Sequence, residues 1–318
     1  MRTRTATLKV WAALLLAVMA AAVAGALLVD GTAKPAHAGA FPGKNGHIAF
    51  DSYRDGKSDI YSMNPDGTNQ TNLSFSVGNI SPSYSASGKK IAFASSRDGN
   101  AEVYTMNANA TLQTRLTTNP ASDSSPSYSP DGKKIAFESS RPDGQATIDY
   151  EIYSMNANGT GVKQLTSDPT DDRYPEWSPN GKKIAFVSAR KGGEQVWVMN
   201  ADGTHQHQLT SLGQNSVPSW SPSGKKIVFA SSRDGNWEIY SLNSDGSNQT
   251  NLTKNSAYDS NPCYSPNGKM LAFQSLRDGF NSEIYTMTSS GDQQTNRTNN
   301  AGTNNAAYDD RPSWQPLH

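Results

Sequence analysis

Charged and amide side chains recur at matching places along the chain, and they are the first candidates for binding chemistry. The recurring arginines are Arg54, Arg97, Arg141, Arg190, Arg233 and Arg277. An Asp or Asn three residues before a proline recurs as Asn79, Asp123, Asp172, Asn215, Asp259 and Asp309. The functional interpretation is a rim of binding residues, because loops on a rigid scaffold can vary and so carry binding sites. The simpler interpretation is local pairing within each repeat, because a binding site usually breaks symmetry.

Departures from the repeat are therefore the more informative positions. An insertion lengthens the third repeat over residues 142–150, and Asp171-Asp172-Arg173-Tyr174 crowds the connection that follows it. The fifth and sixth repeats carry an aromatic residue at a corresponding place. We expect a partner site with aromatic anchors, because aromatic residues lead among interface hot spots. The predicted site residues are Asp123, Asp172, Asp259, Asp309, Arg97, Arg173, Arg233, Tyr150, Trp237 and Phe280. Ordinary packing over the sheet edges is the alternative for the three aromatics.

The elements that position these residues are four short strands in each repeat of about 45 residues. The phrase Ser-Pro-x-Gly-Lys-Lys-Ile-Ala-Phe recurs, for example over Ser129–Phe137 and Ser178–Phe186. A Pro-x-aromatic segment precedes each phrase and predicts strand A, and Ile-Ala-Phe predicts strand B. An Ile-Tyr-x-Met segment predicts strand C, and the segment before Leu-Thr predicts strand D. Asp-Gly pairs, such as Asp98-Gly99, predict the hairpins between them.

Six such repeats predict an all-β fold, a six-bladed β-propeller of four-stranded antiparallel blades over residues 42–318. The first repeat lacks strand A, whereas Arg311–Gln315 resembles a strand A with nothing after it. We expect the C-terminal strand to complete blade one and close the ring. The D–A and B–C connections then share one face, called the loop face. The A–B and C–D turns share the opposite face, called the turn face.

Three further candidates are weaker. Paired lysines recur at the A–B turns, as in Lys89-Lys90 and Lys133-Lys134, and would suit an anionic wall polymer or lipid headgroups; solvated turns are the simpler interpretation. His205 and His207 lie two apart on a segment predicted as a strand, which would place both imidazoles on one face for a metal. No cofactor is expected, although Ca²⁺ or Mg²⁺ held in the channel by inner aspartates stays open. No catalytic residues can be assigned, and inner positions are expected to be Ser, Tyr, Trp and Pro.

The N-terminus predicts export. A basic stretch precedes an uncharged run over residues 10–29, and Ala36-His37-Ala38 matches a signal-peptidase site. Residues 1–38 are thus expected to be a signal peptide, or an uncleaved membrane anchor, the only membrane contact expected. The lone cysteine, Cys263, cannot form an intrachain disulfide. Basic and acidic residues balance at 28 each, unlike the basic excess of nucleic-acid binders, so no nucleic-acid partner is expected.

The repeat resembles that of TolB-type propellers, whose phrase is Asp-x-x-Pro-x-Trp-Ser-Pro-Asp-Gly-Lys-x-Ile-Ala-Phe-x-Ser-x-Arg. The resemblance implies a periplasmic, secreted or cell-surface propeller that binds an envelope or extracellular protein or peptide without catalysis. Similar blades also precede hydrolase domains or form polysaccharide lyases, so a glycan hydrolase, lyase or cell-wall glycan-binding module is the alternative. We expect no hydrolase domain, since no Gly-x-Ser-x-Gly elbow occurs, and no additional N-terminal α/β domain.

Overall fold

The computed structural model describes residues 41–142, 149–279, 281–299 and 308–318, and they form six four-stranded antiparallel sheets. The A strands are β24 (Asp309–Leu317), β4 (Asn79–Tyr84), β8 (Asp123–Tyr128), β12 (Asp172–Trp177), β16 (Asn215–Trp220) and β20 (Asp259–Tyr264). The B strands are β1 (Lys44–Ser52), β5 (Lys90–Ser95), β9 (Lys134–Ser139), β13 (Lys183–Ser188), β17 (Lys226–Ser231) and β21 (Met270–Ser275). The C strands are β2 (Asp59–Met63), β6 (Glu102–Asn107), β10 (Glu151–Asn156), β14 (Gln195–Asn200), β18 (Glu238–Asn243) and β22 (Glu283–Thr288). The D strands are β3 (Thr71–Asn72), β7 (Thr114–Arg115), β11 (Lys163–Gln164), β15 (His207–Gln208), β19 (Thr250–Asn251) and β23 (Thr295–Asn296).

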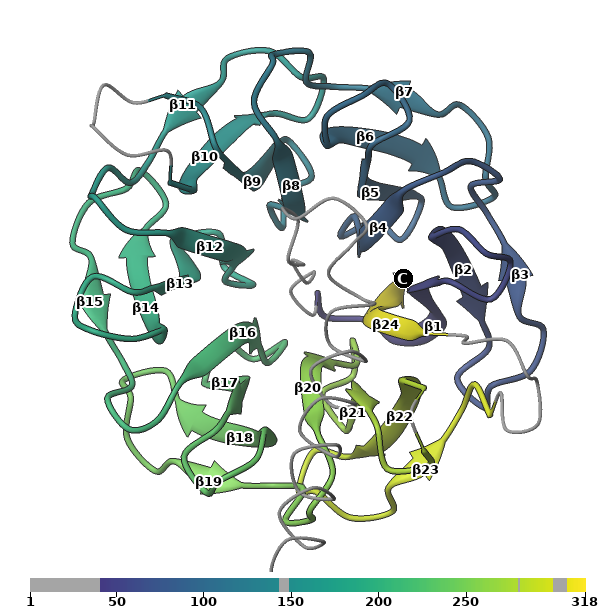
Figure 1. Ribbon diagram of the computed structural model, residues 1–318, viewed down its shortest axis with the longest axis vertical. Coiled ribbons are helices and arrows are strands. Elements are labelled where there is room, and N and C mark those ends of the chain that lie inside the picture. Colours follow the sequence, from purple (N-terminus) through teal and green to yellow (C-terminus); the bar gives the residue numbers. More distant parts are fainter. Residues whose placement is uncertain (1–40, 143–148, 280, 300–307) are drawn as a thin grey trace, which may run out of the picture. The chain divides into compact units, whose positions relative to one another are not determined.

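The sheets are the blades of a ring, with the A strands innermost and the D strands outermost (Figure 1). Each A strand packs against the next, including β24 against both β20 and β4. The prediction of a closed six-bladed propeller is thereby confirmed. Within the described ranges, no helix is long and apolar enough to cross a bilayer.

Blade one is closed by the two ends of the propeller. The C-terminal β24 pairs antiparallel with β1, with Trp314 opposite Ile48 and Ser313 opposite Ala49. Trp314 then packs in one buried cluster with Phe50 of blade one and Cys263 of blade six. This cluster matches those at the other blade junctions, so the closing junction is an ordinary blade interface. In a closed ring the inner sheet edges are short and face the axis, where they are protected from pairing with another chain.

Every A strand contains a β-bulge at the residue before its proline. These residues have positive φ angles between 52° and 59°, and the register with strand B shifts at each of them. They are Ser81, Ser125, Tyr174, Val217, Asn261 and Arg311. A bulge accommodates the proline that cannot donate to the ladder, and it re-aims neighbouring side chains. Positive φ is costly for a β-branched residue such as Val217, so the geometry is imposed by the ring rather than by local preference.

Candidate functional site

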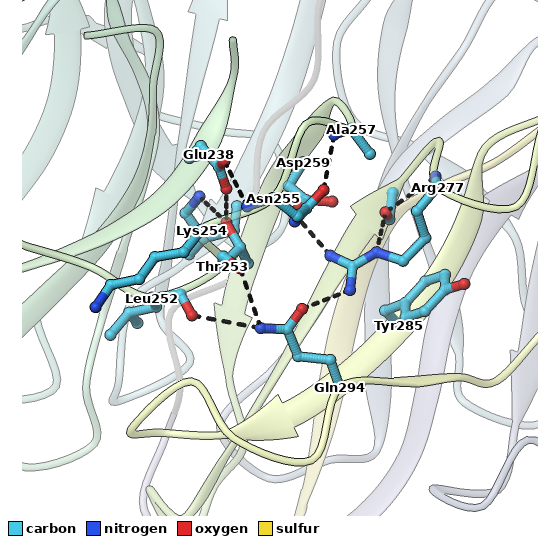
Figure 2. A network of polar contacts seen from close by, with 12 residues as sticks. Glu238, Leu252, Thr253, Lys254, Asn255, Ala257, Asp259, Arg277, Tyr285 and Gln294 are labelled. Carbon is cyan, nitrogen blue, oxygen red and sulfur yellow. Dashed lines mark hydrogen bonds and ion pairs between the residues drawn. The ribbon is translucent and has the colours of Figure 1, made fainter. Parts of the chain in front are cut away.

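One arginine in each blade joins three strands on the loop face. In blade six, Arg277 contacts Asp259 Oδ2 at 2.8 Å and donates from Nε to Ser275 Oγ at 2.8 Å. It also donates to the Gln294 side chain, and its guanidinium lies 4.6 Å from the centre of the Tyr285 ring (Figure 2). The Asp lies on strand A, the Ser on strand B and the Tyr on strand C. The arginine therefore ties a blade together through hydrogen bonds and a cation–π contact.

The same arrangement accounts for most of the predicted site residues. Asp123, Asp172, Asp259 and Asp309 are fully buried and pair with Arg141, Arg190, Arg277 and Arg54 respectively. Arg97 and Arg233 donate to the amide oxygens of Asn79 and Asn215. Each pair lies within one blade, so these groups are engaged inside the protein. Their role as partner contacts stays a prediction.

A second network fixes the loop that leads from each D strand to the next A strand. In blade five, Glu238 accepts hydrogen bonds from the Asn255 backbone N–H at 2.8 Å and from the Thr253 hydroxyl (Figure 2). Asn255 in turn donates its amide to Asp259 Oδ2 at 2.6 Å. The carboxylate at the start of strand C thus fixes the D–A loop through hydrogen bonds. The loops of the loop face are consequently held in defined conformations.

The connection between blades three and four departs from this pattern. Asp168 stands where blades two and five have the amides Asn119 and Asn255. Carboxylate oxygens of Glu151, Asp168 and Asp172 lie within 4.8 Å of one another. Burial raises the pKa of Asp172 to about 8 and that of Glu151 to about 7. Arg190 contacts Asp168 at 2.6 Å and also pairs with Asp172. The guanidinium already supplies a countercharge between these carboxylates, so they do not require a metal ion.

Arg173 and Tyr150 are brought together beside this cluster. The Arg173 guanidinium lies 3.8 Å from the centre of the Tyr150 ring, and it also contacts Asp171 at 2.9 Å. Tyr150 is buried beneath this guanidinium, and its role as a partner anchor stays a prediction. Trp237 is half-buried against Tyr258, with ring centres 6.2 Å apart. Phe280 and residues 143–148 of the insertion lie outside the described residues.

Charged side chains also gather at the inner end of the blades, where only Ser, Tyr, Trp and Pro were expected. Arg311 contacts Asp51 at 3.3 Å, and Asp51 accepts the Ser81 backbone N–H at 3.1 Å. Across the ring, Glu138 accepts the Tyr174 backbone N–H at 3.0 Å, and burial raises the pKa of Tyr174 well above its ordinary value. The expectation failed because it considered only the Pro-x-aromatic positions.

The sequence distinguishes two inner acids from the residues at the corresponding positions of other repeats. Glu138 occupies a strand-B position that is Ala94 in blade two and Ala230 in blade five, and Glu176 occupies a strand-A position that is Ser in four blades. Glu176 is buried and accepts the Trp220 backbone N–H at 2.8 Å, and burial raises its pKa well above the ordinary value. Comparing the repeats position by position would have found both residues.

The two histidines do not share a strand face. His205 lies in the C–D turn with φ of 55°, before β15 begins at His207. Its Nδ1 lies 3.1 Å from the Thr204 hydroxyl, and His207 Nδ1 lies 3.2 Å from the His205 carbonyl oxygen. The expected alternation of a strand therefore does not apply, and the prediction of a common face is wrong.

Several apolar side chains of the loop face are more exposed than the predicted anchors Tyr150 and Trp237. Phe75 is 70% exposed, Leu212 is 64% exposed and Val77 is 57% exposed, all in D–A loops. Tyr53, Tyr258 and Tyr308 add exposed aromatic rings on the same face. The Tyr53 backbone N–H donates to the Tyr308 carbonyl at 2.9 Å, so these two residues come from adjoining loops.

Fold and face together define a closed six-bladed β-propeller with a structured loop face. The chain belongs to the TolB β-propeller domain family, whose model matches residues 33–150 and 210–316. The model of the dipeptidyl peptidase IV N-terminal region matches residues 129–219. No curated protein sequence is significantly similar to the chain.

Similar solved structures support the fold. TolB from Acinetobacter baumannii is 24% identical with a TM-score of 0.73, covering 85% of this chain and 67% of that one. A putative TolB from Agrobacterium tumefaciens is 22% identical with a TM-score of 0.61, covering 86% and 92%. An oligogalacturonate lyase from Vibrio parahaemolyticus is 11% identical with a TM-score of 0.56, covering 82% and 77%. At these identities the likeness concerns the fold alone.

Proposed function

We propose that the protein is an exported, non-catalytic binding propeller of the cell envelope, and that its loop face docks a protein or peptide. Membership of the TolB β-propeller domain family and the predicted export segment support this function. The observation that carries it is the exposure of Phe75.

The backbone geometry at Phe75 keeps its side chain exposed to solvent instead of packed in the core. Its backbone has φ of 52°, and its N–H and that of Ser74 donate to Asn72 Oδ1 at 3.2 and 3.0 Å. The corresponding residues of blades five and six, Lys254 and Asn299, have the same local bonds and a positive φ. A large apolar side chain at a strained, solvated position stabilises neither the blade nor the loop, whereas exposed apolar groups are typical of interaction sites.

The charged side chains at the inner end of the blades form the central part of the proposed docking face. Asp51, Asp310 and Arg311 belong to blade one, and Glu138 and Arg173 lie near the axis from blades three and four. Exposed apolar residues on the same face as paired charges suit a peptide segment that carries both kinds of group.

The inner acids also favour one alternative. A lyase or hydrolase acting on an extracellular glycan, or a module that binds such a glycan without turnover, would use carboxylates at the axis. Incubating the protein with an acidic polysaccharide, with and without Mn²⁺ or Ca²⁺, would test this alternative. Appearance of unsaturated ends or new reducing ends would favour the enzyme, and binding without products would favour the glycan module.

A pair of substitutions tests the docking function. Residues 39–318 are immobilised and used to capture proteins from an envelope extract, alongside Phe75→Asn and, on the turn face, Leu112→Asn. Asn is the residue of blade six at the first position and of blades one and five at the second, so both variants should fold. We expect a captured protein to be lost with Phe75→Asn and retained with Leu112→Asn. Equal retention by both variants would contradict docking through the loop face.

A further inference from the structure

The turn face carries a ring of lysines. They are Lys44, Lys89, Lys90, Lys133, Lys134, Lys163, Lys182, Lys183, Lys225, Lys226 and Lys269, and all but Lys183 are exposed. Every blade contributes at least one of them. None of them takes part in an ion pair among the described residues.

Backbone hydrogen bonds hold these lysines at one level. In blade two the Ala108 N–H of the C–D turn donates to the Lys89 carbonyl of the A–B turn at 2.8 Å. The corresponding bonds reach Lys133, Lys182, Lys225 and Lys269 at 2.8–3.0 Å. Because blades two to six repeat this bond, the A–B and C–D turns of each of these blades are joined, and together they form the rim of the turn face.

The aspartates on the same face do not cancel this charge. They are Asp66, Asp131, Asp202, Asp245 and Asp292, which the lysines outnumber. Asp66, Asp202 and Asp245 accept hydrogen bonds from their own turns, which lowers the pKa of each carboxyl and keeps it ionised. Since the chain is neutral overall, this basic face is balanced by acids elsewhere, most of them on the loop face.

Apolar side chains project from the same rim. Leu112 is 75% exposed at the tip of the C–D turn of blade two, Val162 is 43% exposed in that of blade three, and Leu317 is 44% exposed at the C-terminus. The residues that correspond to Leu112 in blades one, four and five are Asn69, His205 and Asn248. A leucine among lysines at a turn tip is typical of a surface that contacts both headgroups and acyl chains.

The chain also enters the propeller on this face. The Gly43 N–H donates to the carbonyl of Pro266, in the A–B turn of blade six, and Lys44 pairs with Leu317. The described part of the chain therefore begins on the turn face.

From these observations we propose that the turn face lies on an anionic lipid bilayer. A rim formed by turns of all six blades suits a planar surface, and the exposed leucine and valine favour a bilayer over a soluble polyanion. Each lysine near an anionic surface adds to the attraction, which decays within a Debye length. This inference does not depend on the docking function, which uses the opposite face.

Vesicle binding with matched charge variants tests the proposal. Residues 39–318, which contain the closed ring and lack the uncharged run, are mixed with phosphatidylcholine vesicles that contain or lack 30% phosphatidylglycerol. The test variant replaces Lys89, Lys133 and Lys225 by Glu. The control replaces Lys57, Lys191 and Lys254 of the loop face by Glu, with the same change in net charge. Thermal melts check that both variants fold.

We expect binding only to the anionic vesicles, and weakening of at least about 10-fold in the test variant against less than about 3-fold in the control. Leu112→Asn should weaken binding several-fold without a change in charge, and 0.5 M salt should release most of the protein. Equal weakening in both triple variants would overturn the proposal. So would binding to soluble polyphosphate together with no binding to vesicles.

Discussion

The guanidinium of Arg54 binds both carboxylate oxygens of Asp309, at 3.0 Å to Oδ1 and 2.9 Å to Oδ2, across 255 residues of sequence. In the other blades the same pair joins residues 18 apart, such as Arg277 and Asp259. The contact that stabilises a single blade elsewhere therefore joins the two ends of the propeller in blade one.

Removing the closing strand should open the ring. Deleting residues 309–318 removes the buried Trp314 and leaves β1 and the packing faces of blades six and two exposed. We expect loss of cooperative unfolding, or a fall in melting temperature of more than about 10 °C. Deleting only residues 317–318, which are largely exposed, is the control and should lower it by a few degrees at most. Similar melting curves for the two deletions would contradict closure by β24.

The arginine of each blade should matter more than the charge of its partner. Arg277→Ala leaves the buried Asp259 without its cation, so we expect a loss of about 3 kcal/mol in the free energy of unfolding, measured in urea. Asp259→Asn should cost less than about 1.5 kcal/mol, because blades two and five already pair arginine with Asn79 and Asn215. Equal losses for the two variants would show that the charge itself carries the stability.

Asp51 should make the protein less stable as the pH rises. Burial raises its pKa to about 7 in the folded state, from an ordinary value near 3.8, so the folded protein retains a proton that the unfolded chain has released. Stability is thus lost between about pH 4 and pH 7. Asp51→Asn removes this loss. The free energy of unfolding of the variant minus that of the native protein should therefore increase by about 2–4 kcal/mol from pH 5 to pH 8.

Urea unfolding at both pH values measures this difference. Asp66→Asn is the control, because the Thr68 hydroxyl lowers the pKa of this exposed carboxyl, which is then ionised throughout the range. The difference in free energy of unfolding between Asp66→Asn and the native protein should be the same at both pH values. An unchanged difference for Asp51→Asn as well would show that Asp51 is ionised at pH 5.

The glycine of the C–D turn should be replaceable only where space allows. In Gly67, with φ of 90°, an added Cβ would lie 2.2 Å from the Arg297 carbonyl oxygen of blade six. Gly67→Ala should cost about 2 kcal/mol or more, whereas Gly56→Ala, with φ of 75° and open space, should cost about 1 kcal/mol.

Blade two offers the reverse test at the matching turn position. There the residue is Ala110, with φ of 71°, so Ala110→Gly should be neutral or stabilising by up to about 1 kcal/mol. Thermal melts of the three variants measure both effects. A destabilised Ala110→Gly variant would mean that the methyl group packs in a way that outweighs its backbone strain.

The sequence alone determined the architecture, because it repeats. The period of about 45 residues, the Asp-Gly hairpins and the strand A near Trp314 are local patterns, and four strands per repeat with a missing first strand admit one closed arrangement. The paired lysines were visible in the same way, since every A–B turn lies on the same face.

The tertiary structure decided which groups meet. Arg54 and Asp309, or Arg311 and Asp51, are far apart in the chain, and only the closed ring places them together. Burial was also decided there: the Tyr150 ring is covered by Arg173, whereas Phe75 is exposed in a loop that is bonded to Asn72. Local residue types determine the strands, but tertiary contacts within and between blades determine exposure, charge pairing and pKa.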